Sequence, residues 1–319
     1  MDLLDDENIS DFLEKENKYT RNRIVVLGRQ GAGKTTFLSL LYSTLWSSKD
    51  GLKMETLEGS RHAEFLKTAL KIKKGEKIEP TTDATQSTME LIYKSKKRTM
   101  VTLDYMGEVF TDAFIKDINS EPVLALLNHI DHAQAVILLV DPKQVLETDV
   151  DAHIDNTYGI LQVVNRIHNW PGGDEIPIVI AFTKADENQD IFDSYGGRKN
   201  FMMKYFPDLV QKVRHLHVCK VSVKQPDGSD KIKTGYSSSS LVTPLIYCLD
   251  FIEKNEEALE KIKMDTRLQK FQQELIVTER NKALLLIMFF LVLWIALLYG
   301  IFRFFPEATW LNLKRNIFF

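Results

Sequence analysis

The chain alternates short apolar runs with longer stretches in which apolar residues recur every three or four positions. This pattern predicts strands at residues 24–27, 89–93, 99–103, 135–140, 176–182 and 216–221. It predicts helices at residues 35–46, 61–73, 150–168 and 198–215, a helical stretch ending near residue 130, and a helix over residues 241–282. Strands in alternation with helices predict an α/β fold with a mostly parallel sheet and helices on both faces.

One segment departs from this pattern, because Ala283–Phe302 is a run of 20 residues without a charged side chain. At roughly 1.5 Å per residue, a helix of this length spans the ~30 Å hydrocarbon core of a bilayer. Lys282 and Arg303 flank the run and could place their charges at the two interfaces. A buried core helix is the alternative, but such helices rarely run this long without polar residues. We therefore predict a transmembrane helix, with the lipid bilayer as a partner.

The segments outside this helix indicate its topology. Residues 1–20 are acidic and lack the apolar core of a signal peptide, which predicts a tail-anchored arrangement with a single span near the C-terminus. Residues 303–319 carry aromatic side chains among few charges, and we expect this tail to lie in the membrane interface. Lysine and arginine are similarly frequent on both sides of the span, so the flanking charges do not set the orientation.

Composition excludes several classes of protein. The chain has 41 Lys and Arg against 44 Asp and Glu, a net charge of −3, with 44% hydrophobic residues. These values argue against a disordered tail, a collagen, a disulfide scaffold and a specific nucleic-acid partner. The two cysteines, Cys219 and Cys248, fit a reducing compartment. His129, His132 and His168 lack the spacing of a metal site, and we expect them on the surface.

Residues 28–35 read Gly-Arg-Gln-Gly-Ala-Gly-Lys-Thr and match the pattern G-x-x-x-x-G-K-[ST] between a predicted strand and a predicted helix. Glycines let backbone N–H groups turn inward around phosphate oxygens, and a helix N-terminus adds positive potential. In such a loop Lys34 reaches the β- and γ-phosphates and the Thr35 hydroxyl binds Mg²⁺. An ordinary glycine turn is the alternative, but the flanking elements favour a phosphate loop. Its expected binding residues are Gly28, Gln30, Gly31, Ala32, Gly33, Lys34, Thr35 and Thr36.

Two further motifs follow predicted strands. The Asp104 carboxylate ends one strand and can hold Mg²⁺ through water, and the Gly107 N–H can meet a γ-phosphate. In Thr183-Lys184-Ala185-Asp186 the carboxylate can accept two hydrogen bonds from guanine, whereas adenine lacks that donor pair and would leave the carboxylate unpaired. The Lys184 stem can cover the base, and Ser222, after the last predicted strand, could orient Asp186.

These motifs, in this order and each at a strand end, resemble those of the Ras-like GTPases of the translation-factor-related class, which include an Arf-like branch and the β subunit of the signal recognition particle receptor. The resemblance covers residues 21–255 and implies a six-stranded sheet, one antiparallel edge strand and a GTP/GDP switch. It implies that the phosphate loop binds phosphate and Mg²⁺ and that Asp104 and Gly107 belong to switch II. It further implies that guanine is read by Thr183, Lys184 and Asp186, in a T-K-x-D variant of the commoner N-K-x-D, with Ser222, Val223 and Lys224 as the final element.

The resemblance also requires a switch I threonine that binds Mg²⁺ and the γ-phosphate. Thr81, Thr82 and Thr85 are candidates, and Asp104 follows Thr82 by 22 residues and Thr85 by 19 residues. The family uses both spacings, the shorter one in its Arf-like branch, and we favour Thr85. The expected Mg²⁺ ligands are therefore Thr35, Thr85 and Asp104.

Two residues depart from the family pattern. Glu108 stands where Ras-like enzymes place a water-orienting glutamine, and its negative charge beside a γ-phosphate makes it a poor substitute, so we expect slow GTP hydrolysis. Gln30 stands where Ras has glycine, and it could crowd an arginine finger or itself approach the γ-phosphate. Arg29 is a weaker candidate for an arginine acting in cis, since a solvated role is the simpler interpretation. The residues expected to act in catalysis are Lys34, Thr85, Gly107 and Gln30.

The expected organisation is an acidic arm (1–20), a GTPase domain (21–255) with an insertion near 51–79, a juxtamembrane helix (256–282), a transmembrane helix (283–302) and an interfacial tail (303–319). The leading hypothesis is a membrane-anchored GTP/GDP switch with its GTPase domain in the cytosol, where GTP is found, acting on an unidentified effector. A GTP-binding receptor subunit that does not hydrolyse GTP is the second hypothesis. A dynamin-like remodeller, for which one stalk helix is too little, and a GTPase of a bacterial or phage conflict system rank lower.

Overall fold

The computed structural model describes residues 22–48, 51–56, 58–76, 78, 85–104, 107–114, 116, 118–147, 149–170, 172–222 and 238–304. By its internal contacts the chain divides into two units, Met1–Glu253 and Lys254–Phe319. The first unit contains the sheet, and the second contains most of the final helix.

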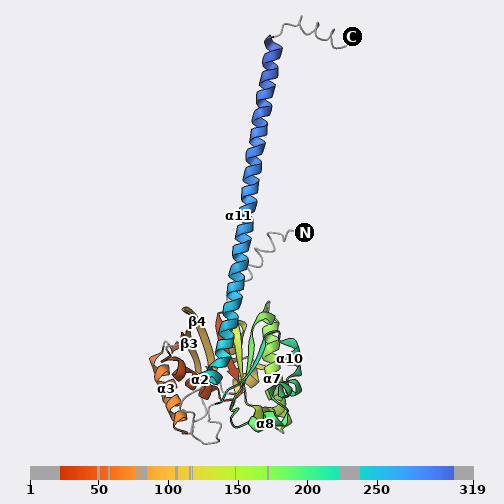
Figure 1. Cartoon of the computed structure of the whole chain (residues 1–319). Helices are drawn as coiled ribbons and strands as arrows, with labels where there is room; N and C mark the ends of the chain where they lie inside the picture. Colours follow the sequence, from red (N-terminus) through yellow and green to blue (C-terminus); the bar gives the residue numbers. More distant parts are fainter. Residues whose placement is uncertain are drawn as a thin grey trace. The chain divides into compact units, whose positions relative to one another are not determined.

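The first unit is built on a seven-stranded sheet with the strand order β2-β3-β4-β1-β5-β6-β7 (Figure 1). The strands are β1 (Arg23–Gly28), β2 (Leu52–Thr56), β3 (Thr85–Tyr93), β4 (Lys96–Asp104), β5 (Ala133–Val140), β6 (Ile178–Phe182) and β7 (Leu216–Lys220). Strands β4, β1, β5, β6 and β7 are parallel to one another, whereas β3 is antiparallel to both of its neighbours. The α/β fold with a mostly parallel sheet, predicted from the sequence, is confirmed.

The seventh strand, β2, corrects the expectation of six strands. It lies inside the polar insertion expected near residues 51–79 and pairs with β3, so the antiparallel strand is second from the edge and not at the edge. Leu52 and Met54 are buried and Lys53 between them is exposed. This alternation is the ordinary signature of a strand with one buried face. The polar composition of the insertion concealed it.

Helices cover both faces of the sheet. They are α2 (Lys34–Leu45), α3 (Gly59–Lys73), α4 (Gly107–Phe114), α5 (Glu121–Asp131), α6 (Pro142–Val145), α7 (Val150–His168), α8 (Gln189–Ser194), α9 (Arg198–Tyr205), α10 (Pro207–Lys212) and α11 (Ser238–Phe304), with a short 3-10 helix at Gly173–Glu175. In β1, Ile24 and Val26 pack into the core that includes residues of α2, α3 and the start of α11. Val25 and Leu27 pack into the other core, with residues of α4, α5, α7, α9 and α10. Burial on both faces explains why this strand is a continuous apolar run.

The predicted helix over residues 198–215 is two helices, α9 and α10. Phe206 adopts an extended φ of −132° before Pro207, which cannot donate a helical hydrogen bond and restricts the residue before it. The hairpin between β3 and β4 also differs from the prediction, because its turn is Lys94-Ser95 alone, with both residues at positive φ. The basic residues after Ser95 belong to β4.

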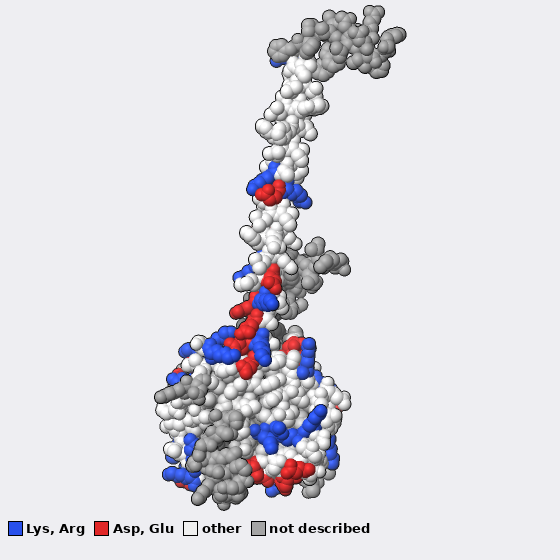
Figure 2. Space-filling model, viewed as in Figure 1, with Lys and Arg blue, Asp and Glu red and all other residues white. Residues whose placement is uncertain are grey.

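The second unit consists, in its described part, of helix α11 from Lys254 onward. This is the one described helix that is long and apolar enough to cross a membrane, with a mean hydropathy of 2.8 over its best 18 residues and none of them buried. Side chains from residue 267 to residue 299 are exposed. Figure 2 shows a long stretch of α11 without Lys, Arg, Asp or Glu above a cluster of charged side chains, and a basic side chain again at the end of the helix. The acidic arm (1–20) and most of the predicted interfacial tail (303–319) lie outside the described residues.

Candidate nucleotide-binding site

The motifs predicted from the sequence meet at the carboxyl edge of the parallel strands. In the sheet register Gly28 lies beside Leu139 of β5, and Val140 lies beside Phe182 of β6. The phosphate loop (Gly28–Thr36) follows β1, and the base loop, defined here as Thr183–Asp186, follows β6. Open α/β sheets bind their ligands at this edge.

The phosphate loop needs its glycines for two separate reasons. Gly31 and Gly33 have φ values of 77° and 83°, in the left-handed region that glycine adopts without strain. At Gly28 the backbone passes so close to β5 that a Cβ atom would lie 2.8 Å from the Leu139 carbonyl oxygen. Successive N–H groups in such a conformation form a concave nest for an anion.

Lys34 is buried at the first position of α2, with 7% of its surface exposed. Its ammonium group donates hydrogen bonds of 2.8 and 3.1 Å to the carbonyl oxygens of Gly28 and Arg29. The charge is thereby held at the loop and at the N-terminus of α2, whose first turn contains no acidic residue. Thr35 and Thr36 follow it in the same turn and are half-buried. This set of donors and hydroxyl oxygens fits a polyphosphate with its Mg²⁺ ion.

The short helix α6 supports the phosphate loop. Gln144 Nε2 donates a hydrogen bond of 2.8 Å to the carbonyl oxygen of Gln30, and a Cβ on Gly31 would lie 2.9 Å from the same nitrogen. Asn156, buried in α7, donates to the Gln144 carbonyl oxygen at 2.6 Å and thereby ties α6 to α7. Sequence reasoning missed Gln144 and Asn156. One sequence feature could have drawn attention to this region. The pair Asp141-Pro142 ends a buried strand at the sheet edge where ligands bind.

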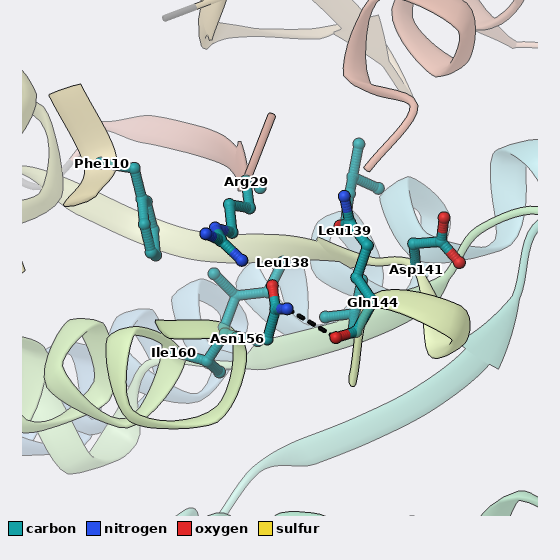
Figure 3. Close-up of a pocket in the computed structure, with 10 residues that line it drawn as sticks. Arg29, Phe110, Leu138, Leu139, Asp141, Gln144, Asn156 and Ile160 are labelled. Carbon is teal, nitrogen blue, oxygen red and sulfur yellow. Dashed lines mark hydrogen bonds between the residues drawn. The ribbon is translucent and has the colours of Figure 1, made fainter. Parts of the chain in front are cut away.

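Behind the phosphate loop lies a cavity of about 20 Å³, large enough for about one water molecule. It is lined by Gly28, Arg29, Phe110, Leu138, Leu139, Val140, Asp141, Gln144, Asn156 and Ile160. Figure 3 shows that the Arg29 side chain extends toward Phe110 and Asn156. Arg29 therefore reaches α4 and α7, the helices behind the loop.

The base loop is fixed to the sheet on both sides. Thr183 is buried, and its N–H donates a hydrogen bond of 2.9 Å to the Val140 carbonyl oxygen. The Ala185 N–H donates to Val221 at 3.3 Å, which joins the base loop to the segment that contains Ser222. Lys184 has a positive φ of 50°, so its side chain leaves the loop in a direction that a regular turn would not give.

A buried carboxylate orders the lysine of the base loop. Asp141 is 4% exposed and accepts a charged hydrogen bond of 2.6 Å from Lys184 Nζ. Its other oxygen accepts from the Lys143 N–H at 3.0 Å and from Asn188 Nδ2 at 3.2 Å. Because a buried charge is stable only when it is paired and hydrogen-bonded, Asp141 holds the Lys184 stem in one orientation. Sequence reasoning did not assign this role to Asp141.

The phosphate loop and the base loop are neighbours. A Cβ atom on Gly33 would lie 3.8 Å from the Thr183 Cβ atom. Through Gln144 and Asp141, α6 contacts both loops at once. The two loops therefore lie side by side at this edge of the sheet.

The residues expected to form the switches are placed only in part. Thr85 and Asp104 are direct partners in the antiparallel β3–β4 register, at the end of the hairpin nearest the phosphate loop. Gly107 begins α4, and Glu108 follows it in the same helix, although its side chain lies outside the described residues. Also outside the described residues lie Thr81, Thr82, Val223 and Lys224.

A scan against protein-family models matches residues 22–245 to the model described as Double-GTPase 2. The matched range contains the whole phosphate loop, the β3–β4 hairpin and the base loop. No curated protein matches the chain at a significant level.

Three solved structures with a similar fold are a translation elongation factor, a signal recognition particle receptor complex and a GTPase-like domain. Translation elongation factor SelB from Methanococcus maripaludis, in complex with a GTP analogue, has a TM-score of 0.36 at 14% identity, and the match covers 73% of this chain and 34% of that one. The signal recognition particle receptor complex SRb-GTP/SRX from Chaetomium thermophilum has a TM-score of 0.35 at 17% identity, with 72% and 98% covered. The GTP-bound GTPase-like domain of Ski7 from S. cerevisiae has a TM-score of 0.44 at 16% identity, with 78% and 52% covered. The chain thus spans about a third of the elongation factor and half of the Ski7 chain.

Proposed function

The chain belongs to the Double-GTPase 2 family, and we propose that it is a membrane-anchored GTP-binding protein that switches between GTP and GDP states and hydrolyses GTP slowly. The observation that carries this proposal is the proximity of a phosphate loop of the G-x-x-x-x-G-K-[ST] form to a T-K-x-D loop, since a Cβ atom on Gly33 would lie 3.8 Å from the Thr183 Cβ atom. The first loop suits a polyphosphate and the second suits guanine.

The phosphate end of the nucleotide would be bound by backbone N–H groups of the phosphate loop and by Lys34. The buried ammonium group already lies against the loop, so binding phosphate requires little rearrangement of its side chain. Mg²⁺, when bound with the nucleotide, would neutralise phosphate charge, and Thr35, Thr85 and Asp104 are the residues that would hold it. Thr82 is the alternative to Thr85.

The guanine end would be read by Asp186, with the Lys184 stem lying along the face of the base. The Lys184 ammonium group is held by Asp141, which fixes the far end of this stem. Thr183 and Ser222, from the ends of β6 and β7, complete the binding surface for the base.

Slow hydrolysis is proposed because Glu108 follows Gly107 at the start of α4. A carboxylate beside a γ-phosphate repels its charge and is a poor group for orienting water. Gln30 and Arg29 of the phosphate loop remain candidates for a compensating role. A receptor or docking subunit that binds GTP without turnover is the alternative function, and the same glutamate favours it.

Membrane anchoring is proposed from Ala283–Phe302, which lies in the apolar part of α11. Because GTP is cytosolic, the nucleotide-binding unit would face the cytosol. An effector or activating protein would then recognise the GTP-bound state at the membrane surface.

Asp186→Asn tests the base assignment in the full chain. The amide offers a donor in place of one acceptor, so affinity should move from GTP to xanthosine triphosphate, by a factor of about 100 or more. Asp190→Asn, in the exposed first turn of α8, is the matched control and should leave the preference unchanged. An unchanged preference in Asp186→Asn would mean that this residue does not read the base.

Single-turnover hydrolysis separates the two candidate functions. A switch should convert bound GTP to GDP slowly, and Glu108→Gln should accelerate the conversion about 10-fold or more because the glutamine can orient water. Tight GTP binding with no conversion in either protein would favour the receptor function.

A further inference from the structure

A groove beside strand β7 lies away from the nucleotide site. It has a volume of about 490 Å³. It is lined by Gly196, Gly197, Arg198, Lys199, Met202, Met203, Val210, Leu216 and Val218. These residues come from the start of α9, from α10 and from β7, and none of them belongs to the phosphate loop or the base loop.

The groove combines an apolar floor with a basic end. Met202 is buried, while Met203 is 49% exposed, so the apolar surface is open to solvent. Arg198 and Lys199 begin α9 and supply positive charge, and no residue that lines the groove in the described part of the chain is acidic. Methionine side chains adapt to the shape of an apolar partner. The groove therefore suits a segment with apolar and acidic side chains.

The adjoining strand β7 is an edge strand in the described part of the chain. Among the described residues β7 pairs with β6 and forms the last strand of the sheet. Open edges next to apolar surface are normally covered or charged in stable proteins. A segment that lies in the groove would cover both the edge of β7 and the apolar surface beside it.

The N-terminal segment of the chain is long enough to span the distance to this groove. The register joins Val25 to Val136, Val136 to Ile178 and Ile178 to Leu216, so the start of β1 and the start of β7 lie in one row across the sheet. Three strand spacings separate them, about 14 Å. The 21 residues that precede Asn22 could extend roughly 70 Å. They therefore need only a small part of their length to reach the groove.

The chemistry of that segment is complementary to the groove. Residues 1–20 contain seven acidic residues and two lysines. Their apolar side chains include Leu3, Leu4, Ile9, Phe12 and Leu13, which are interleaved with the acids. The acids can pair with Arg198 and Lys199, and the apolar side chains can pack on Met202 and Met203.

We propose that residues 1–20 dock in the groove beside β7 of the same molecule. Docking would bury Met203 and cover the free edge of the sheet. The proposal does not depend on which nucleotide the chain binds, because the groove shares no residue with the nucleotide site.

Cysteine labelling of the full chain in nanodiscs tests this docking. Met203→Cys places a thiol in the groove, and Leu70→Cys places one on α3, which packs beside β2 at the other end of the strand order and is 58% exposed. The native thiols are buried, and burial raises the pKa of Cys219 to about 12 and also raises the pKa of Cys248, so both react slowly with maleimide. Labelling rates are compared between the full chain and the same chain without residues 2–20.

Docking should slow labelling at residue 203 about tenfold or more relative to the shortened chain, and labelling at residue 70 should be equal in both. Asp11→Lys with Glu14→Lys should restore fast labelling, whereas Asn8→Gln with Ser10→Ala should not. Equal labelling at residue 203 in the full and shortened chains would overturn the proposal. Protection that appears only when two copies share a nanodisc would also overturn it, since the segment would then come from a second molecule.

Discussion

At the scale of single residues, His129 illustrates what a sequence pattern leaves out. We expected it on the surface, but this expectation was wrong, because it is 7% exposed at the end of α5. Arg23 Nη1 lies 2.6 Å from its Nδ1 atom, and since a guanidinium only donates, the imidazole accepts this bond in its neutral form. Residue spacing alone could not reveal a partner 106 positions away.

Acid should destabilise the fold through His129. Burial, followed by the positive charge of Arg23, lowers its pKa from 6.5 to about 4. Between these values the unfolded chain binds a proton that the folded chain does not, so stability is lost as the pH falls from about 6.5 toward 4. The free energy of unfolding of the parent chain should fall between pH 7.5 and pH 5. In His129→Gln this fall should be smaller by about 2 kcal/mol.

His132→Gln, changed three residues away, is the control for this pH effect and should keep most of the parent difference, because the charge of His132 is the smallest of the three causes that lower the pKa of His129. Some pH dependence of the free energy of unfolding should remain in His129→Gln, because burial also lowers the pKa of His168 and of His217. If His129→Gln retained the full difference, the loss of stability in acid would arise elsewhere.

Gln144 should affect phosphate affinity without affecting base affinity. Gln144→Ala removes the hydrogen bond to the Gln30 carbonyl oxygen, which contributes about 1 kcal/mol and corresponds to about fivefold in affinity. Binding of GTP and GDP should weaken by this factor, and binding of guanosine should stay the same. Lys143→Ala, an exposed neighbour, should change neither. A parallel loss for guanosine would mean that Gln144 acts by general packing of α6.

At the scale of elements, the sequence predicts most of the sheet and part of the site. Buried parallel strands such as β5 and β6 are visible as apolar runs because both of their faces are covered. Strand β2 was missed because one of its faces is polar, and α8 was missed because its six residues are too few to show a helical period.

The candidate site also has a part that the sequence predicts and a part that it does not. The phosphate loop is local, and eight consecutive positions specify it. The roles of Asp141 and Gln144 depend on the meeting of β5, α6 and the base loop, and those contacts join residues 43 and 114 positions apart. Contacts of this range follow from the packed fold and leave no local pattern in the sequence.

The contact between α5 and α7 should depend on one paired arginine. Arg166 donates two hydrogen bonds, of 2.8 and 2.6 Å, to the two oxygens of Asp131 at the end of α5. Arg166→Met leaves a mostly buried carboxylate unpaired and should lower the free energy of unfolding by about 2 kcal/mol. Arg214→Met, which removes an exposed pair with Glu175, should cost at most about 0.5 kcal/mol in the same denaturation assay. Equal effects would contradict the account of this interface.

At the scale of the whole molecule, a nucleotide-binding fold and an apolar helix share one chain. The average composition conceals both, since almost all charged residues precede residue 283, four follow residue 302, and Ala283–Phe302 has none. The motifs locate the proposed nucleotide site, and the uncharged run locates the proposed anchor. Neither feature identifies an effector.

Charges placed in the uncharged run should release the protein from membranes. Leu291→Arg with Ile295→Arg adds two cations near its centre, at about 3 kcal/mol each. After alkaline extraction the parent chain should float with liposomes and the double variant should stay in solution. Leu70→Arg with Leu124→Arg, at exposed positions of the first unit, should float like the parent. Flotation of the first variant would argue against a span at Ala283–Phe302.

The central claim is that the edge of the sheet binds guanine nucleotide through the phosphate loop and the base loop together. Equilibrium binding of GTP and of ATP to the full chain in nanodiscs, with Mg²⁺ present, tests it most directly. GTP should bind at least about 100-fold more tightly than ATP, because only guanine can satisfy the Asp186 carboxylate. Equal affinity for the two nucleotides, or binding of neither, would contradict it.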